Sequence, residues 1–155
     1  MVEHPMSRLK RVNAGDAAVD GLLAGLVAGL VKGLFLVLAG VLAGGAWRDV
    51  LIQLDPQGSS VLRGLLAHFA VAGIYGAIFG VVASRFRRVR PGWLAGLVYS
   101  LFVLLFAWFV LLPVAAPALR EVGAPTWAFG HVIYGLLLGT LAASSESAGS
   151  RLSSR

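Results

Sequence analysis

Two histidines, His68 and His131, lie within apolar stretches of this 155-residue chain, and each precedes a Tyr-Gly-x-x-x-Gly pattern. The tyrosines are Tyr75, seven residues after His68, and Tyr134, three residues after His131. On a helix, residues separated by three or seven positions share a face. The pattern therefore predicts two similar helices, each presenting an imidazole and a phenol, and these four residues form a hypothetical polar binding site.

Two imidazoles from different helices of a bundle are the minimum for bis-histidine haem b, because the iron takes two axial nitrogens. The favoured alternative is that His68 and His131 each make an interhelical hydrogen bond or reach interfacial water. We therefore expect no cofactor, with haem b as the alternative, and a proton-responsive pair as a further option. A zinc site is not favoured, because the nearest carboxylates, Asp49, Asp55 and Glu121, lie in connections between helices.

The composition is that of a membrane protein. Hydrophobic residues make up 58% of the chain against 13% charged residues, and there are 20 glycines and no cysteine. Small residues allow helices to approach closely in lipid. The formal charge of +6 comes from short basic clusters beside apolar runs, which favours membrane topology over nucleic-acid binding.

Four apolar runs, over residues 17–46, 61–84, 93–112 and 126–143, are long enough to cross the hydrocarbon core. We predict an all-α integral membrane bundle of four transmembrane helices. Residues 1–16 are expected to form a cytoplasmic tail, and the serine-rich residues 144–155 a disordered cytoplasmic tail.

Lysine and arginine placement sets the expected orientation. Basic residues cluster before the first run, between the second and third, and after the fourth, whereas the other side of the bundle has Arg48, Arg63 and Arg120. The positive-inside rule then places both termini in the cytoplasm. The second and fourth spans run in the same direction, so His68 and His131 are expected at similar depth near the outer face.

Glycines suggest how the spans pack. Gly21, Gly25, Gly29 and Gly33 recur every four residues in the first span, which predicts a close-packing stripe. Contact with another helix of the same chain is favoured over a dimer seam. The repeated Tyr-Gly-x-x-x-Gly pattern also suggests a duplicated two-helix unit.

Lys32 is the charged residue inside the first apolar run. We expect its amine to reach the cytoplasmic interface by snorkelling. The alternative is a contact with an anion or a lipid phosphate, shared with the cluster that contains Arg85, Arg87 and Arg88.

No hydrolase, kinase or metalloprotease motif is present in the sequence, so we expect no enzyme. The prediction is a non-enzymatic multispan membrane protein with an accessory, structural or stress-related role. A haem b electron carrier and a small channel or transporter component are the alternatives. The expected partners are the lipid bilayer and either further copies of the chain or a larger membrane complex.

The segment Gly25–Gly33, the tetrapeptide Ala128-Phe129-Gly130-His131 and the glycine-containing span led by His68 resemble the YagU-like family of small bacterial inner-membrane proteins. The resemblance implies a multi-pass protein of the bacterial inner membrane, with a suggested link to acid tolerance and no established catalytic residues. It marks Lys32, His68 and His131 as positions to test.

Overall fold

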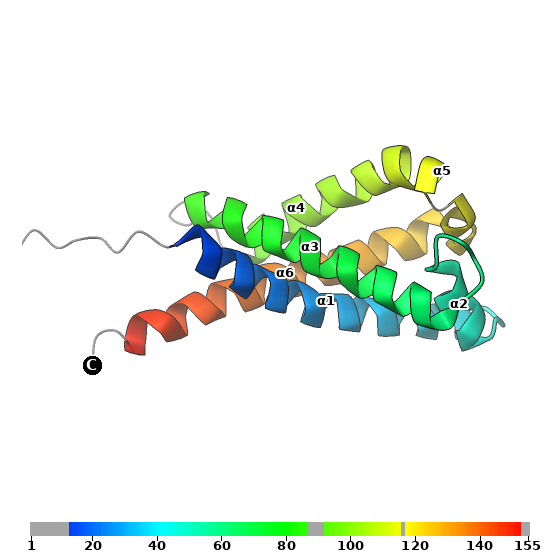
Figure 1. Ribbon diagram of the computed structural model, residues 1–155, viewed down its shortest axis with the longest axis horizontal. Helices are drawn as coiled ribbons and strands as arrows, with labels where there is room; N and C mark the ends of the chain where they lie inside the picture. Colours follow the sequence, from blue (N-terminus) through cyan, green and yellow to red (C-terminus); the bar gives the residue numbers. More distant parts are fainter. Residues whose placement is uncertain (1–12, 87–91, 116, 153–155) are drawn as a thin grey trace, which may run out of the picture.

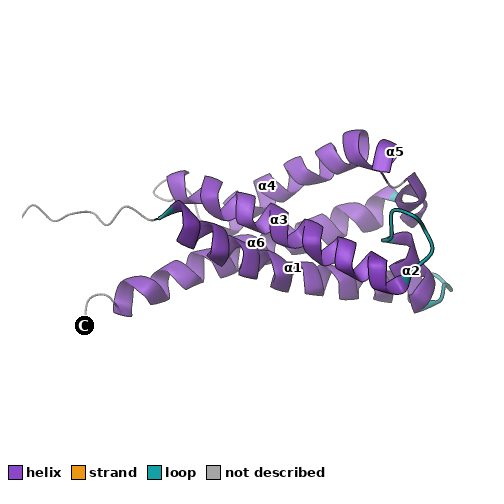
Figure 2. Ribbon diagram, viewed as in Figure 1, coloured by secondary structure: helices purple, strands orange, loops and turns teal. Residues whose placement is uncertain are grey.

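The computed structural model describes residues 13–86, 92–115 and 117–152 (Figure 1). These residues form helices joined by short connections, and the described part of the chain contains no strand (Figure 2). The elements in chain order are α1 (Ala14–Leu42), α2 (Trp47–Gln53), α3 (Val61–Phe86), α4 (Gly92–Phe106), the π-helix η1 (Ala107–Leu111), α5 (Leu112–Ala115), the 3₁₀-helix η2 (Pro117–Val122) and α6 (Ala124–Leu152).

Four of these stretches are long and apolar enough to span a membrane: Ala14–Leu42, Val61–Arg85, Gly92–Val114 and Ala124–Ser145. They lie side by side as a bundle, with α1 beginning and α6 ending at one end and α2 at the other (Figure 1). We call the end that carries α2 and η2 the distal end; the positive-inside rule predicts that it faces outward. The prediction of an all-α four-helix membrane bundle is confirmed.

The bundle places small residues inside and large apolar residues outside. Ala24, Ala28 and Ala72 are buried, whereas Leu34, Phe102 and other large side chains of the spans are exposed. Such a surface would promote aggregation in water, but lipid tails solvate it as well as a protein core would. The fold is therefore that of a multi-pass helical membrane protein.

The first connection differs from expectation. α1 ends at Leu42, because the chain turns at Gly44 with a φ of 89°, a conformation that glycine adopts without strain. The first apolar run was expected to extend to Ala46, four residues beyond the end of the helix. The connection then contains the short helix α2, where Asp49 accepts a hydrogen bond from the backbone N–H of Ala46 at 3.4 Å.

The C-terminal boundary also differs. The prediction of a disordered tail from Ser144 was wrong as far as Leu152, because α6 continues to that residue. The extension is rich in serine and contains one glycine, but it has no proline that would stop the helix. Of the expected N-terminal tail, residues 1–12 lie outside the described part of the chain.

Glycine-to-glycine contacts join α1 to α3. A Cβ added at Gly21 would lie 2.3 Å from the carbonyl oxygen of Gly76, and one added at Gly80 would lie 2.0 Å from that of Ala17. Neither helix can carry a side chain here without moving its neighbour. The prediction that this stripe packs within the chain is confirmed for Gly21 and Gly25, the latter 2.5 Å from Ala72 O by the same measure.

α4 and α6 are joined in the same way. A Cβ at Gly96 would lie 2.1 Å from Gly135 O, and one at Gly139 would lie 2.1 Å from Gly92 O. Gly76 and Gly135 are the glycines that follow the tyrosine in the repeated sequence pattern. The chain thus consists of two helical hairpins, each closed by equivalent glycines, in agreement with the predicted duplication.

The two hairpins meet unevenly. α1 packs extensively against α6, whereas α3 and α4, which hold the corresponding positions on the other side, touch only sparingly. Figure 1 shows α4 and α5 diverging from α3 toward the distal end. One side of the bundle is therefore closed and the other is open.

Candidate functional site

The centre of the candidate site is a hydrogen bond between α1 and α6. The Nζ atom of Lys32 lies 3.1 Å from Nε2 of His131 and 3.4 Å from Nδ1 of the same ring. The other ring nitrogen of His131, Nδ1, lies 2.8 Å from the carbonyl oxygen of Trp127, one turn earlier in α6. The carbonyl can only accept, so Nδ1 carries the hydrogen and Nε2 accepts from Lys32. His131 is thereby fixed as a neutral acceptor.

Aromatic rings and a glycine surround the lysine side chain. Nζ lies 5.0 Å from the centre of the Trp127 ring and 5.8 Å from that of Tyr134, within the range of cation–π attraction. The stem of Lys32 passes over Gly130, where an added Cβ would lie 3.5 Å from Cγ and Cε. The Trp127 ring also stacks on His131, with ring centres 5.4 Å apart. The amine is thus held in place by α6.

The expectation that Lys32 snorkels to the cytoplasmic surface was wrong. Its side chain is 9% exposed and points into the bundle, about 27 Å along α1 from Ala14. Arg85 is exposed near the other end of the bundle, in the last turn of α3. The two residues do not share a site, and Arg87 and Arg88 lie outside the described residues.

His68 contacts α1 on the side of the bundle formed by α3. Its Nε2 lies 2.8 Å from the carbonyl oxygen of Gly29 and donates a hydrogen bond to it. A Cβ at Gly33 would lie 3.2 Å from the same nitrogen, so a side chain at position 33 would crowd the ring. Gly33 therefore makes room for an imidazole, whereas Gly29, where an added Cβ would lie 2.6 Å from Cβ of Ala72, allows α3 to approach closely.

The two histidines are not arranged as axial ligands of one haem. The Nε2 atom of His68 is bonded to Gly29 O at 2.8 Å, and Nε2 of His131 is bonded to Lys32 at 3.1 Å. Ligation of one iron by both rings would require both hydrogen bonds to break. The part of the chain that the structure describes also holds no group of three or more metal-ligating side chains.

Both predicted tyrosines lie at the site, and a third joins them. Tyr134 donates to the carbonyl oxygen of Ala72 at 2.7 Å, which ties α6 to α3. Tyr99, which the sequence reasoning missed, donates to Tyr75 O at 2.8 Å and bridges α4 and α3. Ser100, the next residue, is fully buried and donates to His131 O at 2.6 Å.

A cavity of about 230 Å³ is lined by Lys32, His68, Tyr75, His131 and Tyr134, but not by Tyr99 or Ser100. Lys32, His68 and His131 form its polar part, and most of the remaining wall is apolar, contributed by α3, α4, η1, α5 and α6. Val71 lines the cavity and is also 43% exposed on the outside of α3. Val71 on α3 and Pro56 in the distal connection are thus lining residues that also reach the surface of the protein.

The distal connection between α2 and α3 contributes Leu54 and Pro56 to one end of the cavity.

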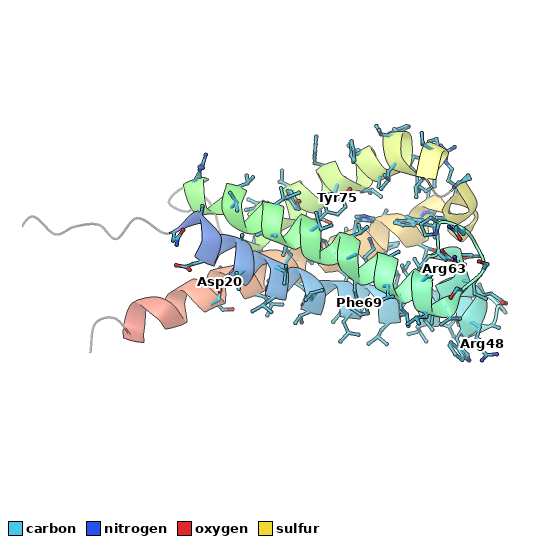
Figure 3. The ribbon with its side chains drawn as sticks, viewed as in Figure 1. Asp20, Arg48, Arg63, Phe69 and Tyr75 are labelled. Carbon is cyan, nitrogen blue, oxygen red and sulfur yellow. The ribbon has the colours of Figure 1, made fainter. Side chains whose placement is uncertain are left out.

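The buried carboxylate of Asp55 stabilises this connection. It accepts backbone hydrogen bonds at 3.0 to 3.1 Å from Gln57, Ser59 and Ser60, and its Oδ2 lies 3.4 Å from Nε of Arg63. Burial raises the pKa of this carboxyl, but the three N–H donors and the Arg63 charge together outweigh it, so the pKa lies below its usual value. Arg63 also bonds the side chains of Gln57 and Ser59. Figure 3 places Arg63 and Arg48 at this distal end and Asp20 near the opposite end.

The opposite wall contains a local change of helix type. η1 is a π-helical turn in the third span, and its first and last residues, Ala107 and Leu111, line the cavity. Such turns occur frequently at functional sites.

A second distal contact is made by Trp127, whose indole N–H donates to Leu119 O in η2 at 2.8 Å. Leu54, Pro56, Leu119 and Trp127 thus line the distal end of the cavity.

Comparisons with known proteins assign no relative. No family model matches the chain, and no curated protein and no solved structure matches it. The resemblance to the YagU-like family stays a prediction.

Proposed function

We propose that this protein is a non-enzymatic membrane protein that binds an apolar molecule from the bilayer in the cavity between α3 and α4. The observation that carries the proposal is the combination of apolar walls, a lining residue of α3, Val71, that is exposed on the lipid-facing surface, and one buried amine. Ligand sites are typically concave and mostly apolar, with a few placed polar groups.

The cavity volume argues against a simple packing defect. Protein interiors contain few voids larger than a water molecule, and a water occupies about 30 Å³ of liquid. The space here is about 230 Å³, and most of its wall offers water no hydrogen bond. A hydrocarbon chain suits such walls better than a cluster of waters.

The polar groups favour binding over catalysis. His131 is engaged on both ring nitrogens, and the Ser100 hydroxyl is bonded to His131 O. No carboxylate lies beside these groups among the residues that line the cavity. A nucleophile with an adjacent base, or a pair of carboxylates, would be needed for the common hydrolytic mechanisms.

We place this function in a multi-pass protein of a bacterial inner membrane, with an accessory or stress-related role. The support is the YagU-like resemblance and the distribution of basic residues at the ends of the spans. A ligand taken from the bilayer fits such a role.

The proposal is tested by fluorescence quenching. Trp127 lines the cavity, so a variant with Trp47, Trp93 and Trp108 replaced by phenylalanine reports on that position alone. Dibromostearyl alcohol, an uncharged chain with a quenching bromine pair, should quench Trp127 saturably in detergent micelles.

A matched pair of substitutions on α3 provides the control. Ala67 lines the cavity, whereas Ala70, three residues later, is exposed on the outer face. Ala67→Phe should abolish saturable quenching, and Ala70→Phe should leave it unchanged. Equal quenching in both variants, or a linear response to the alcohol in the parent, would refute the proposal.

A further inference from the structure

We infer that the ligand is a single-chain carboxylic acid whose carboxylate pairs with the amine of Lys32. The inference rests on the proposed binding function and names the chemical class of ligand. It depends on three features of the site: an amine without a counter-ion, free donors on that amine, and a cavity that holds a headgroup with only part of a chain.

The first feature is charge. Lys32 is buried, and the described side chains place no carboxylate in an ion pair with it; the salt bridge seen among them joins Arg63 and Asp55. An ammonium buried without an opposite charge is strongly disfavoured, and ionisable residues inside membranes usually find a partner. An anionic headgroup supplies the missing charge.

The second feature is the number of donors. An ammonium has three N–H groups, and His131 Nε2 accepts one of them. The rings of Trp127 and Tyr134 attract the cation through their faces. A ring face has no lone pair that could accept a strong hydrogen bond. Two N–H groups therefore remain for a ligand in the cavity, which matches the two oxygens of a carboxylate.

The charge of the site also selects between anions. A phosphate monoester carries between one and two negative charges at neutral pH and is usually held by several donors or an arginine cluster. Here one cation lines the cavity, and the two imidazoles are already hydrogen-bonded. A monoanion is the better match in charge.

The third feature is size. Pockets that enclose a drug-sized ligand are about 300–1,000 Å³, and this cavity is about 230 Å³. It accommodates a carboxylate and the first part of one chain. The rest of the chain passes out beside Val71, between α3 and α4, and stays in the bilayer. A phospholipid with two chains does not fit this path as well as a single-chain acid does.

The test compares three headgroups on one chain in the single-tryptophan protein. Dibromostearic acid, dibromostearyl alcohol and dibromostearyl phosphate are titrated at neutral pH, with concentrations expressed as mole fraction in the micelle. The acid should bind at least about tenfold more tightly than the alcohol, the factor expected for one charge-assisted hydrogen bond. Lys32→Met should remove this preference, because methionine fills similar space without a charge. Arg85→Met, which removes an exposed cation near the other end of the bundle, should retain it.

Each outcome bears on a different step. Equal binding of acid and alcohol in the parent overturns the carboxylic-acid inference and leaves the proposed function standing. This comparison needs no substitution at Lys32, so it decides even where Lys32→Met fails to fold. A preference for acid that survives Lys32→Met overturns the role of Lys32. Tighter binding of the phosphate than of the acid overturns the choice of carboxylate. Failure of all three compounds to quench Trp127 refutes the proposed function as well.

Discussion

Lys32 on the first spanning helix donates a hydrogen bond to His131 on the last, over 3.1 Å. The contact crosses the closed side of the bundle, where α1 packs against α6. It joins the two hairpins through polar atoms within the membrane-spanning region, where lipid tails have no group that could replace the hydrogen bond. The pair therefore contributes to hairpin association as well as to the ligand site.

This hydrogen bond predicts energetic coupling between the two residues. His131→Leu leaves the amine without its acceptor and should cost about 1–3 kcal/mol of unfolding free energy. Lys32→Met leaves Nε2 of His131 without its donor but should cost less, since a neutral ring nitrogen is less costly to bury unpaired than an amine. The double variant should reveal a coupling of about 0.5–2 kcal/mol, measured by denaturation in mixed micelles. Thr140→Val, at an exposed position farther along α6, serves as the control and should be additive with Lys32→Met. Additivity of Lys32→Met with His131→Leu would contradict the contact.

The glycine contacts predict that the effect of a glycine-to-alanine substitution on stability depends strongly on its position. Gly96→Ala places a methyl group 2.1 Å from the backbone oxygen of Gly135, and overpacking of this kind costs about 1–3 kcal/mol. Gly15→Ala, in the first turn of α1, meets nothing closer than 3.5 Å and should be neutral or stabilising by a few tenths up to about 1 kcal/mol. Thermal unfolding in detergent measures both. Similar melting temperatures for the two variants would argue that α4 and α6 are not in close contact.

The Asp55 network predicts a pH-dependent stability of the distal connection. Because the pKa of Asp55 is lowered in the folded protein, the ionised carboxyl stabilises the fold at pH values above its unfolded pKa, about 3.9. The contribution is lost as the pH falls through the lower folded pKa. Asp55→Asn should lower the melting temperature at neutral pH, and the difference from the parent should shrink in strongly acidic buffer. Asp49→Asn, at an exposed site with a single 3.4 Å bond, should have a smaller effect. A difference that is independent of pH would exclude the carboxylate as its cause.

The two interhelical tyrosines should differ in their effect on the open side. Tyr99 links α4 to α3 where these helices touch little, whereas Tyr134 links α6 to α3 in the core. Tyr99→Phe should widen the separation of α3 and α4, and Tyr134→Phe should leave it unchanged while reducing stability by about 0.5–1.5 kcal/mol. The chain has no cysteine, so two cysteines can be introduced at positions 74 and 98, in place of Ile74 and Val98, and spin-labelled. The distance between the two labels then measures the separation of α3 and α4. An unchanged distance distribution in Tyr99→Phe would refute this role.

The sequence predicted the architecture because it depends on long apolar runs and small residues, which are local properties. His68, Tyr75, His131 and Tyr134 came together as expected, since two parallel spans bring equivalent positions to similar depth. The packing of Gly21 and Gly25 within the chain was also predicted correctly. These features need no knowledge of how the hairpins meet.

The role of Lys32 could not be predicted in this way. A lysine near a helix end and one facing a bundle interior have the same local sequence, and only the packing of α1 on α6 distinguishes them. Gly130, which makes room for the lysine stem, was a signal available in the sequence but meaningful only with that packing known. The bond from Tyr99 and the π-helical turn at Ala107–Leu111 likewise depend on tertiary geometry. Polar contacts between distant segments carry little local signature.

The glycine-closed hairpins have a consequence for biosynthesis. α1 and α3 complete their backbone-to-backbone contact with residues that precede α4 in the chain, so the first pair can insert and close before the second is made. Association of the two pairs then rests on the α1 and α6 faces, the bond from Lys32 to His131 and the bonds from Tyr99 and Tyr134 to α3. Two polypeptides, one ending after α3 and one beginning before α4, should accordingly reassemble in a membrane when they are produced together.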